Sequence, residues 1–364
     1  MHSLQKEICN YLTGQAFDFL NMVSYYRKFL VIAGTIALTC VMLVASACSS
    51  TKTDNPEINN GAHLLTPEIV TRDLAVGENS FSLGLLTLDQ KLINDARVDA
   101  RFFYLTESGE ETLRGEGSLD AVTIDLRSIH VHDDDTLHVH NEDRLSVYKA
   151  LVTFDQAGVW AVEITAEVDN VIMGPAITYF DVREKSLSPS VGSPAPRSDQ
   201  LILSDVDNIS DIDTSMNANP NMHNMTIASA VLSGNPTLIF FGTPAFCTSR
   251  TCSSMKDTID SLYDEYNDRV NFIHIEPYFL EQARSGSALC SIPIVNLRLA
   301  ADSPNPACPD LTIEDLPPAD QTWGLVTEPW VFIVDKDGDI SAKFEGVASY
   351  LEIENEINVV TEGM

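Results

Sequence analysis

The apolar residues of this chain follow two different patterns, and the change between them falls near residue 186. Between residues 64 and 185, short apolar runs such as ARVDARFFYLT and GVWAVEITAEV alternate with polar residues, and Gly, Asp and Asn separate the runs. Alternation with a period of two, without a long stretch of period 3.6, is typical of strands with one buried face. We therefore expect an antiparallel β-sandwich at 64–185.

The C-terminal region, residues 226–364, alternates strand and helix patterns. Strands are expected at PTLIFFG, VNFIHIE, PWVFIVD and ISAKFEG, and helices at TIASAVLSG, TCSSMKDTIDSLYDEY and YLEIENEINVV. This order is typical of an α/β domain. The polar, Pro- and Ser-rich stretch 186–225 is expected to be a linker between the two domains.

The N-terminal region contains an export signal. An uncharged apolar run, residues 29–47, follows Arg27 and Lys28, which is the order of a secretory signal. About 20 apolar residues also span a bilayer, so an uncleaved N-terminal helix is the alternative. Both interpretations place the rest of the chain outside the cytoplasm, tethered to the cell membrane. Met22 is an alternative start of the chain.

The apolar run ends in Ala45-Ser46-Ala47-Cys48, which resembles the lipobox of bacterial lipoproteins. The resemblance implies that residues 1–47 are removed and that Cys48 is acylated and becomes the mature N-terminus. Ala45 departs from the larger aliphatic residue usual at that position. The polar stretch 48–63 is then expected to be a flexible tether.

The charge of the chain excludes one class of partner. With 22 Lys and Arg against 53 Asp and Glu, the net charge is −31. Nucleic-acid binding needs a basic surface that neutralises phosphates, so no nucleic-acid partner is expected. The acidic residues are scattered, which is typical of a solubilising surface.

Two of the seven cysteines lie between a predicted strand and a predicted helix. Cys247 and Cys252 occur in FFGTPAFCTSRTC, and Pro329 precedes the predicted strand VFIVD. This arrangement resembles the thioredoxin superfamily, particularly its membrane-tethered extracytoplasmic members. The resemblance implies an enzyme for thiol–disulfide exchange with extracytoplasmic thiol or disulfide proteins, without a required cofactor. It also implies that Cys247 is the nucleophile, Cys252 the resolving thiol and Pro329 a cis-proline.

The segment YKALVTFDQAGVWAV resembles the strand, turn and strand of immunoglobulin-like modules. The predicted fold class is therefore an α/β thioredoxin-like C-terminal domain, with a central mixed sheet and flanking helices, plus an all-β immunoglobulin-like sandwich. In this scheme residues 277–323 are an insertion in the C-terminal domain.

The spacing of the cysteine pair constrains its location. A helix N-terminus stabilises a thiolate, and Arg250 is expected to lower the pKa of Cys247 further. Residues five apart in a regular helix have Cα atoms about 8.6 Å apart, whereas a disulfide requires less than about 7 Å. Cys247 must therefore lie in the loop before the helix, or the first helical turn must open.

Other functions of the pair remain as alternatives. Some peroxiredoxins share the Cys-x4-Cys spacing, but their Thr three residues before the reactive Cys is here Pro244, and Phe240 stands where they have Pro. Copper-carrying relatives use a distant His, and the only His after Cys252 is His274, within a predicted strand. A structural disulfide in a protein without redox activity is the remaining alternative.

A second cysteine pair lies in the insertion. Cys290 and Cys308 are expected to form a structural disulfide, which is worth about 3 kcal/mol in the chain-entropy model. The functional alternative is electron relay with the first pair.

Four histidines form a cluster in the N-terminal domain. If residues 133–137 are a hairpin loop, His132 opposes His138 and His130 opposes His140, so that all four imidazoles share one face. Imidazole binds both Zn²⁺ and Cu²⁺, so this face is a candidate site for either metal. A metal-handling or adaptor lipoprotein, with an accessory cysteine pair, is therefore the alternative function. A solvated polar hairpin without metal is the structural alternative.

Overall fold

The computed structural model describes residues 64–131, 137–286, 289–295 and 317–362. Every described residue belongs to one compact unit, Gly61–Met364. The predicted signal segment, the acylation site Cys48 and the predicted tether 48–63 lie outside the described residues. Within the described part, no helix is long and apolar enough to cross a bilayer.

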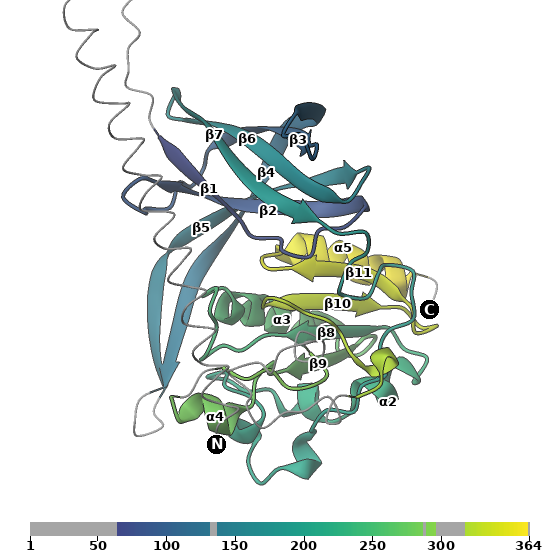
Figure 1. The fold of residues 1–364 in the computed structure, drawn as a ribbon. Helices are drawn as coiled ribbons and strands as arrows, with labels where there is room; N and C mark the ends of the chain where they lie inside the picture. Colours follow the sequence, from purple (N-terminus) through teal and green to yellow (C-terminus); the bar gives the residue numbers. More distant parts are fainter. Residues whose placement is uncertain (1–63, 132–136, 287–288, 296–316, 363–364) are drawn as a thin grey trace, which may run out of the picture. The chain divides into compact units, whose positions relative to one another are not determined.

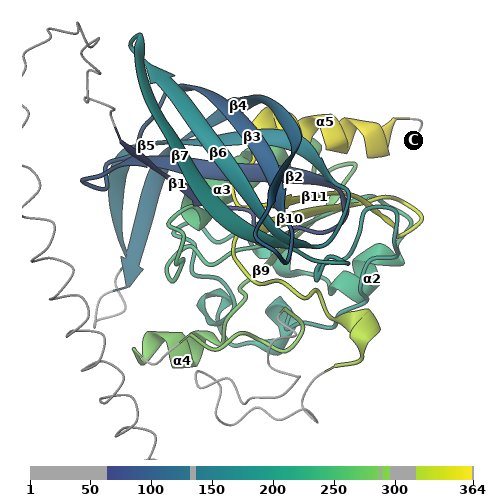
Figure 2. The ribbon, with the colours of Figure 1, turned by 45° about the horizontal axis from the view of Figure 1, so that its top comes forward.

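Seven strands in the described region form one antiparallel sheet, in the order β1-β2-β5-β4-β3-β6-β7 (Figure 1). They are β1 (Leu65–Ile69), β2 (Gly77–Thr87), β3 (Arg97–Leu105), β4 (Glu111–Val131), β5 (Leu137–Phe154), β6 (Gly158–Val168) and β7 (Val171–Val182). The terminal strands β1 and β7 of this order are also in contact, so the sheet is nearly closed (Figure 2).

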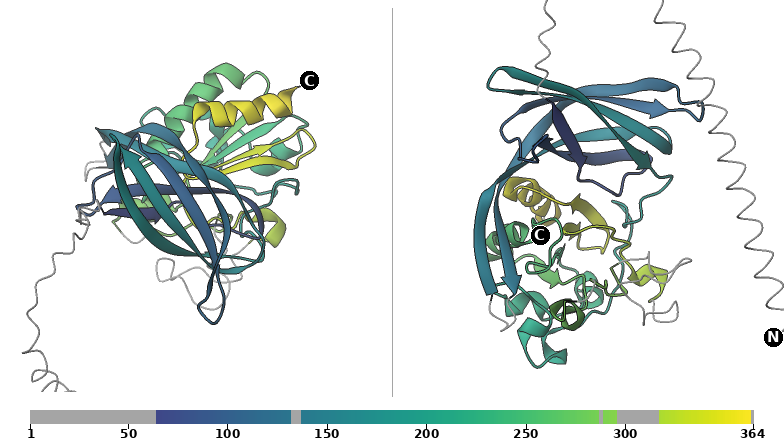
Figure 3. Two further views of the ribbon diagram at one scale, coloured as in Figure 1. Left: turned by 90° about the horizontal axis from the view of Figure 1, so that it is seen from above. Right: turned by 60° about the vertical axis from the view of Figure 1, so that its left-hand side comes forward.

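The two longest strands each pair with different neighbours along their length. β4 pairs with β3 through its first half and with β5 through its second half, and β5 continues alongside β2 (Figure 3). A tight turn at Asp169 and Asn170 joins β6 to β7, and both residues have positive φ, 50° and 64°. Asp and Asn tolerate this conformation, which two-residue hairpin turns require.

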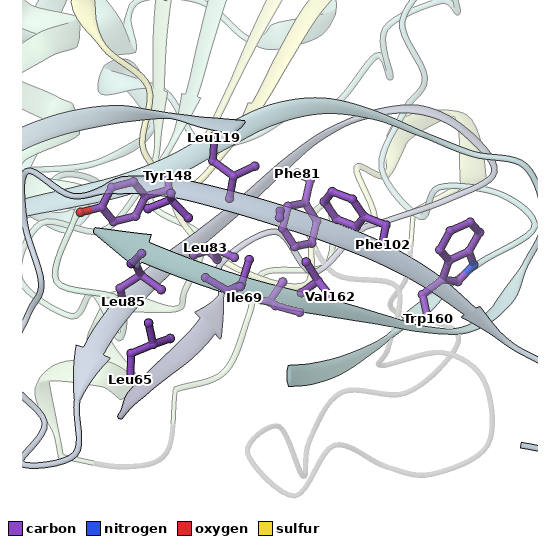
Figure 4. Packing of buried hydrophobic residues seen from close by; sticks show 14 of the residues in the cluster. Leu65, Ile69, Phe81, Leu83, Leu85, Phe102, Leu119, Tyr148, Trp160 and Val162 are labelled. Carbon is purple, nitrogen blue, oxygen red and sulfur yellow. The ribbon is translucent and has the colours of Figure 1, made fainter. Parts of the chain in front are cut away.

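The core of this sheet is built from alternate residues of its strands. Buried side chains from all seven strands pack together (Figure 4), for example Phe81, Leu83 and Leu85 of β2. Phe102 and Phe154 add edge-on ring contacts to this core. Burying each such side chain stabilises the fold by about 1.5–3 kcal/mol. The strand face that carries the apolar residues is therefore the face that is buried.

A second sheet has four strands in the order β11-β10-β8-β9. They are β8 (Thr237–Phe241), β9 (Asn271–Ile275), β10 (Trp330–Val334) and β11 (Ile340–Glu345). β8 and β9 are parallel, whereas β10 is antiparallel to β8 and to β11. The described part contains four α-helices: α2 (Ile227–Val231), α3 (Cys252–Tyr266), α4 (Leu280–Arg284) and α5 (Tyr350–Thr361).

Both faces of the second sheet are buried. On one face, apolar residues of α3 and α5 pack against side chains such as Phe240 and Val331. On the other face, α2 and Trp323 pack with Phe241 and Phe332. The central strands β8 and β10 are buried at every position, which explains their continuous apolar sequences.

The fold class predicted from the sequence is wrong. The described part of the chain is mostly β: a nearly closed seven-stranded antiparallel sheet, a small second sheet and four short helices. It is neither an immunoglobulin-like sandwich nor an α/β thioredoxin-like domain. A sandwich would have two separate sheets. Here β4 pairs with β3 and with β5, and β5 also pairs with β2, so all seven strands belong to one sheet. The connection from β9 to β10 contains, in its described residues, only the five-residue helix α4 and one 3₁₀ turn.

Candidate functional site

Cys247 and Cys252 form a disulfide at the start of α3, with their Cα atoms 5.9 Å apart. Cys252 is the first residue of α3, and Cys247 lies in the loop that follows β8. The loop position brings the two Cα atoms within disulfide range, which a regular helix would not allow at this spacing.

The two sulfur atoms differ in their surroundings. Cys252 is fully buried, whereas Cys247 is half-buried. The Sγ atom of Cys247 accepts a hydrogen bond from the backbone N–H of Cys252 at 3.2 Å and lies 3.2 Å from Ser249 Oγ. Donors at a helix N-terminus stabilise negative charge on sulfur, so Cys247 is the better placed of the two to react as a thiolate.

Arg250 lies between the two cysteines in the sequence and is exposed. Its backbone has a φ of 63°, a left-handed conformation that is uncommon for a residue with a side chain. This left-handed residue lies in the loop between Cys247 and the start of α3.

Glu328 connects the cysteine loop to the start of β10. Its Oε1 atom accepts hydrogen bonds from the backbone N–H and the hydroxyl of Thr248, at 2.9 and 2.6 Å. Its carbonyl oxygen accepts from Ser249 Oγ at 3.0 Å, and its Oε2 accepts from Tyr278 Oη at 2.8 Å. The peptide bond from Glu328 to Pro329 is cis. Glu328 thus holds the segment containing Pro329 beside the cysteine loop.

Sequence reasoning missed Glu328 and Tyr278. The acidic residue directly before Pro329 was a usable signal, but its partners are 80 and 50 residues away in the chain. Burial, together with the charge of Glu328 and the hydrogen bond to it, raises the pKa of Tyr278 above its ordinary value, so the phenol donates to Glu328 at neutral pH.

A second cluster of ionisable side chains is buried around His274 of β9. Asp213 follows the 3₁₀ turn Ile209–Asp211, His223 ends the 3₁₀ helix Pro220–His223, and His274 lies on β9. Asp213 Oδ2 is 2.9 Å from His223 Nε2 and 3.3 Å from His274 Nδ1. These buried atoms all lie within 4.8 Å of one another, so the three residues could hold a metal ion.

The charges in this cluster depend on one another. Burial alone would raise the pKa of Asp213, but the charge of His274 and the imidazole hydrogen bonds hold that pKa well below its usual value. Burial also opposes the charged form of His274, yet the nearby Asp213 raises its pKa. Burial lowers the pKa of His223. Asp213 is therefore a carboxylate that faces two imidazoles.

Glu276 lies beside this cluster at the end of β9. Its Oε1 accepts from the backbone N–H of Thr214 at 2.7 Å and from the Thr214 hydroxyl at 2.6 Å. The Thr214 hydroxyl oxygen also accepts from the backbone N–H of Ala245, two residues before Cys247. Burial is the main cause that raises the pKa of Glu276 to about 7. Glu276 is thus linked to the cysteine loop through Thr214.

The raised pKa of Glu276 predicts a loss of stability with increasing pH. Between its ordinary pKa of 4.5 and its folded pKa of about 7, the folded chain keeps a proton that the unfolded chain releases. The free energy of unfolding should therefore fall as pH rises through this window and stay low above it. Urea denaturation at about pH 5 and about pH 8, with EDTA present, measures this change.

The matched control for this prediction is Glu276→Gln, which keeps the shape of the side chain and stays neutral at both pH values. Its stability should fall less than that of the wild type over the same interval. An equal fall in both proteins would contradict the assignment of this titration to Glu276.

The register of the predicted histidine hairpin differs by two residues from the expected one. His130 on β4 is paired with His138 on β5, and His140 is paired with Ser128, so the predicted oppositions of His132 to His138 and His130 to His140 are wrong. A shift of two residues keeps the same alternation along each strand, so this pairing does not contradict the expected shared face of the histidines. His132 itself lies outside the described residues.

The cysteines of the predicted insertion are described in part. Cys290 is buried and disulfide-bonded, whereas its predicted partner Cys308 lies outside the described residues. Their pairing therefore stays a prediction.

The buried cluster was also missed from the sequence. Asp213 and His223 lie in the stretch expected to be a linker. His274 lies in a predicted strand, where a role in copper binding is not expected. No local spacing connects residues from three separate segments, so only the tertiary structure brings them together.

Comparisons with known proteins do not place the chain in a family. No family model matches it, and no curated protein matches it. Among solved structures, it matches the crystal structure of the outer membrane decaheme cytochrome OmcA, with 12% sequence identity and a TM-score of 0.17. The match covers 49% of this chain and 34% of the cytochrome chain. The matched region therefore spans about a third of the cytochrome's length.

Proposed function

We propose that this chain is a thiol–disulfide oxidoreductase that acts on protein disulfides, with Cys247 as the attacking sulfur and Cys252 as the resolving sulfur. One observation supports this most directly: Cys247 is half-exposed, is bonded to the buried Cys252, and accepts a hydrogen bond from the first N–H of α3. A partner can reach one sulfur and not the other, which gives the pair a defined order of reaction.

The proposed reaction needs only the two cysteines. In the reduced protein, the Cys247 thiolate attacks a substrate disulfide, forms a mixed disulfide and releases one substrate thiolate, which takes up a proton. The Cys252 thiolate then attacks Cys247 Sγ, and the second substrate sulfur leaves as a thiol. The substrate gains two electrons and two protons, and a dithiol reductant returns the Cys247–Cys252 pair to its reduced form. No metal or organic cofactor enters these steps.

The proposal includes a location outside the cytoplasm. Residues 29–47 are apolar and follow two basic residues, which supports export, and Cys48 is the proposed lipid anchor. Extracytoplasmic compartments are oxidising, so disulfides persist and need enzymes that exchange them. The proposed partners are thiol or disulfide proteins on the same side of the membrane.

A Cys252→Ser variant tests the order of the two sulfurs. Without the resolving thiol, the reaction should stop at a mixed disulfide between Cys247 and a peptide from the substrate. The full chain, purified in detergent, would be reduced, incubated with a disulfide-containing peptide and mapped by mass spectrometry. A peptide adduct confined to Cys247 is the expected result.

The matched control is the double variant Cys247→Ser/Cys252→Ser, which should form no adduct. Adducts at Cys290 or Cys308 in the Cys252→Ser protein, with none at Cys247, would contradict the proposed nucleophile. Such a pattern would instead favour a relay through the second cysteine pair.

Metal handling is the second candidate function, and one observation favours it: Asp213, His223 and His274 are buried with ligand atoms within 4.8 Å of one another. The site for Cu²⁺ or Zn²⁺ at His130, His132, His138 and His140 stays a prediction. The two functions respond differently to chelation. Disulfide exchange should persist in EDTA, whereas an activity that depends on a bound metal should be lost.

A further inference from the structure

We propose that Asp213, His223 and His274 form a binding site for a divalent transition-metal ion, for which Zn²⁺ is the appropriate probe. The proposal is independent of the cysteine pair and of thiol–disulfide exchange. It rests on the separations of the ligand atoms, the hydrogen bonding of His274, the burial of the three side chains and the cavity beside them.

The separations suit a four-coordinate ion. Zn²⁺ binds imidazole nitrogen and carboxylate oxygen at about 2.0–2.2 Å, so two ligands of a tetrahedral site lie about 3.3 Å apart. Asp213 Oδ2 is 3.3 Å from His274 Nδ1 and 2.9 Å from His223 Nε2. All three ligand atoms lie within 4.8 Å of one another, so side-chain adjustments would accommodate an ion between them.

His274 is oriented as metal-binding histidines usually are. Its Nε2 atom lies 2.9 Å from the carbonyl oxygen of Gly242, which can only accept, so Nε2 carries a proton. Nδ1 is then the atom available to a ligand, and it faces Asp213 Oδ2 at 3.3 Å. Metal-ligating imidazoles commonly donate their other N–H to a carbonyl in this way.

Asp213 is held in position by its other oxygen. Oδ1 accepts a hydrogen bond from the backbone N–H of Ser215 at 2.7 Å, which leaves Oδ2 directed at the two imidazoles. The side chains of Asp213 and both histidines are at most 2% exposed. A buried, oriented carboxylate between two imidazoles is a preformed set of ligands, because little conformational freedom remains to be lost when an ion binds.

The buried cation packed against this site is already paired. Lys256 of α3 is buried, but its Nζ atom is bound to Asp260 Oδ1 at 2.5 Å, so the pair adds little net charge. Glu276 is also buried, and its Oε1 accepts from the backbone N–H and the hydroxyl of Thr214. The carboxylate of Asp213 is therefore available to offset the charge of a cation.

A cavity of about 1050 Å³ lies beside the two histidines of this site. Its lining includes His223, His274, Glu276, Tyr278 and apolar residues such as Leu280 and Ile294. Three protein ligands with access from a cavity leave a fourth coordination position for water or a small ligand. This arrangement differs from structural zinc sites, which have four protein ligands.

The donor set selects the class of metal. Ca²⁺ and Mg²⁺ prefer sites made of oxygen ligands, whereas two imidazoles and one carboxylate suit Zn²⁺ and neighbouring first-row ions. A proton on His274 Nδ1 competes with a metal ion, because a doubly protonated His274 would pair directly with Asp213 Oδ2. The experiment must therefore separate metal binding from protonation.

Zinc titration of the full chain in detergent, after removal of metals with EDTA, tests the site. A competition assay with a chromophoric chelator at about pH 7.5 should give a tight site for Zn²⁺ and none for Mg²⁺. Asp213→Asn and His223→Gln should each weaken this site at least about 100-fold, since loss of supporting residues alone typically costs about 10- to 100-fold. His138→Gln is the matched control, because it removes an imidazole from the other histidine cluster, and it should leave the Asp213 site unchanged.

Two results would overturn the proposal. One is a wild-type protein that binds no Zn²⁺, which would leave the proton as the occupant. The other is zinc binding that is lost in His138→Gln and retained in Asp213→Asn. A zinc-edge anomalous difference map of the wild-type protein settles the location even if the variants fail to fold. Density among Asp213, His223 and His274 would support the proposal, and density only elsewhere would refute it.

Discussion

Cys247→Ser is expected to abolish disulfide exchange by this protein. A serine hydroxyl is not ionised at neutral pH and cannot form a disulfide, so neither the attack nor the mixed disulfide remains. The assay is reduction of a disulfide-containing peptide by the full chain, with a dithiol as the source of electrons. The rate in the variant should fall to the rate of the dithiol without protein.

Ser249→Ala is the control for local damage to the loop. It removes the hydroxyl 3.2 Å from Cys247 Sγ but keeps both cysteines and the N–H of Cys252. Its rate should be lower than that of the wild type but clearly above background. Full activity in Cys247→Ser would disprove the assigned nucleophile, and equal losses in both variants would point to damage of the loop.

Trp323→Ala is expected to destabilise the protein by about 3–5 kcal/mol, the usual range for removing a large buried aromatic side chain. Trp323 is fully buried, and its ring centre is 5.1 Å from that of Phe241 and 4.7 Å from that of Phe332. Its indole N–H donates to Ser198 Oγ at 3.0 Å. The substitution therefore leaves a cavity and removes a hydrogen bond that ties the 186–225 stretch to this core.

Urea denaturation gives this change as a shift of the transition midpoint at constant slope. Trp323→Phe, which fills most of the cavity, should cost less than the alanine variant. Tyr179→Ala removes an aromatic ring that is 56% exposed and should change stability by less than about 0.5 kcal/mol. A similar small effect for Trp323→Ala would mean that this core does not contribute to the measured transition.

Individual strands and helices were largely predictable from the sequence. The runs ARVDARFFYLT and GVWAVEITAEV correspond to β3 and β6, and TCSSMKDTIDSLYDEY corresponds to α3. Two strand segments were missed for physical reasons. β1 contains Pro67, which is uncommon inside strands, and the first half of β4 is polar and exposed, so it shows no alternation.

The location of Cys247 was predictable because it follows from covalent geometry. A disulfide cannot bridge residues five apart in a regular helix, so the loop position was one of only two solutions. The contacts around the pair were not predictable, since the loop is fastened by Glu328, which is 80 residues further along the chain.

The sequence by itself determined most of the strand segments, which of their faces are buried and where the cysteine pair lies, because periodicity and disulfide geometry act over a few neighbouring residues. Only the tertiary structure decided how the strands pair, and this overturned the predicted fold class. It also set the register of β4 with β5 and brought Asp213, His223 and His274 together, which no local pattern indicates. Strand pairing and site assembly join residues tens of positions apart, and a local pattern of apolar and polar residues is compatible with many such pairings.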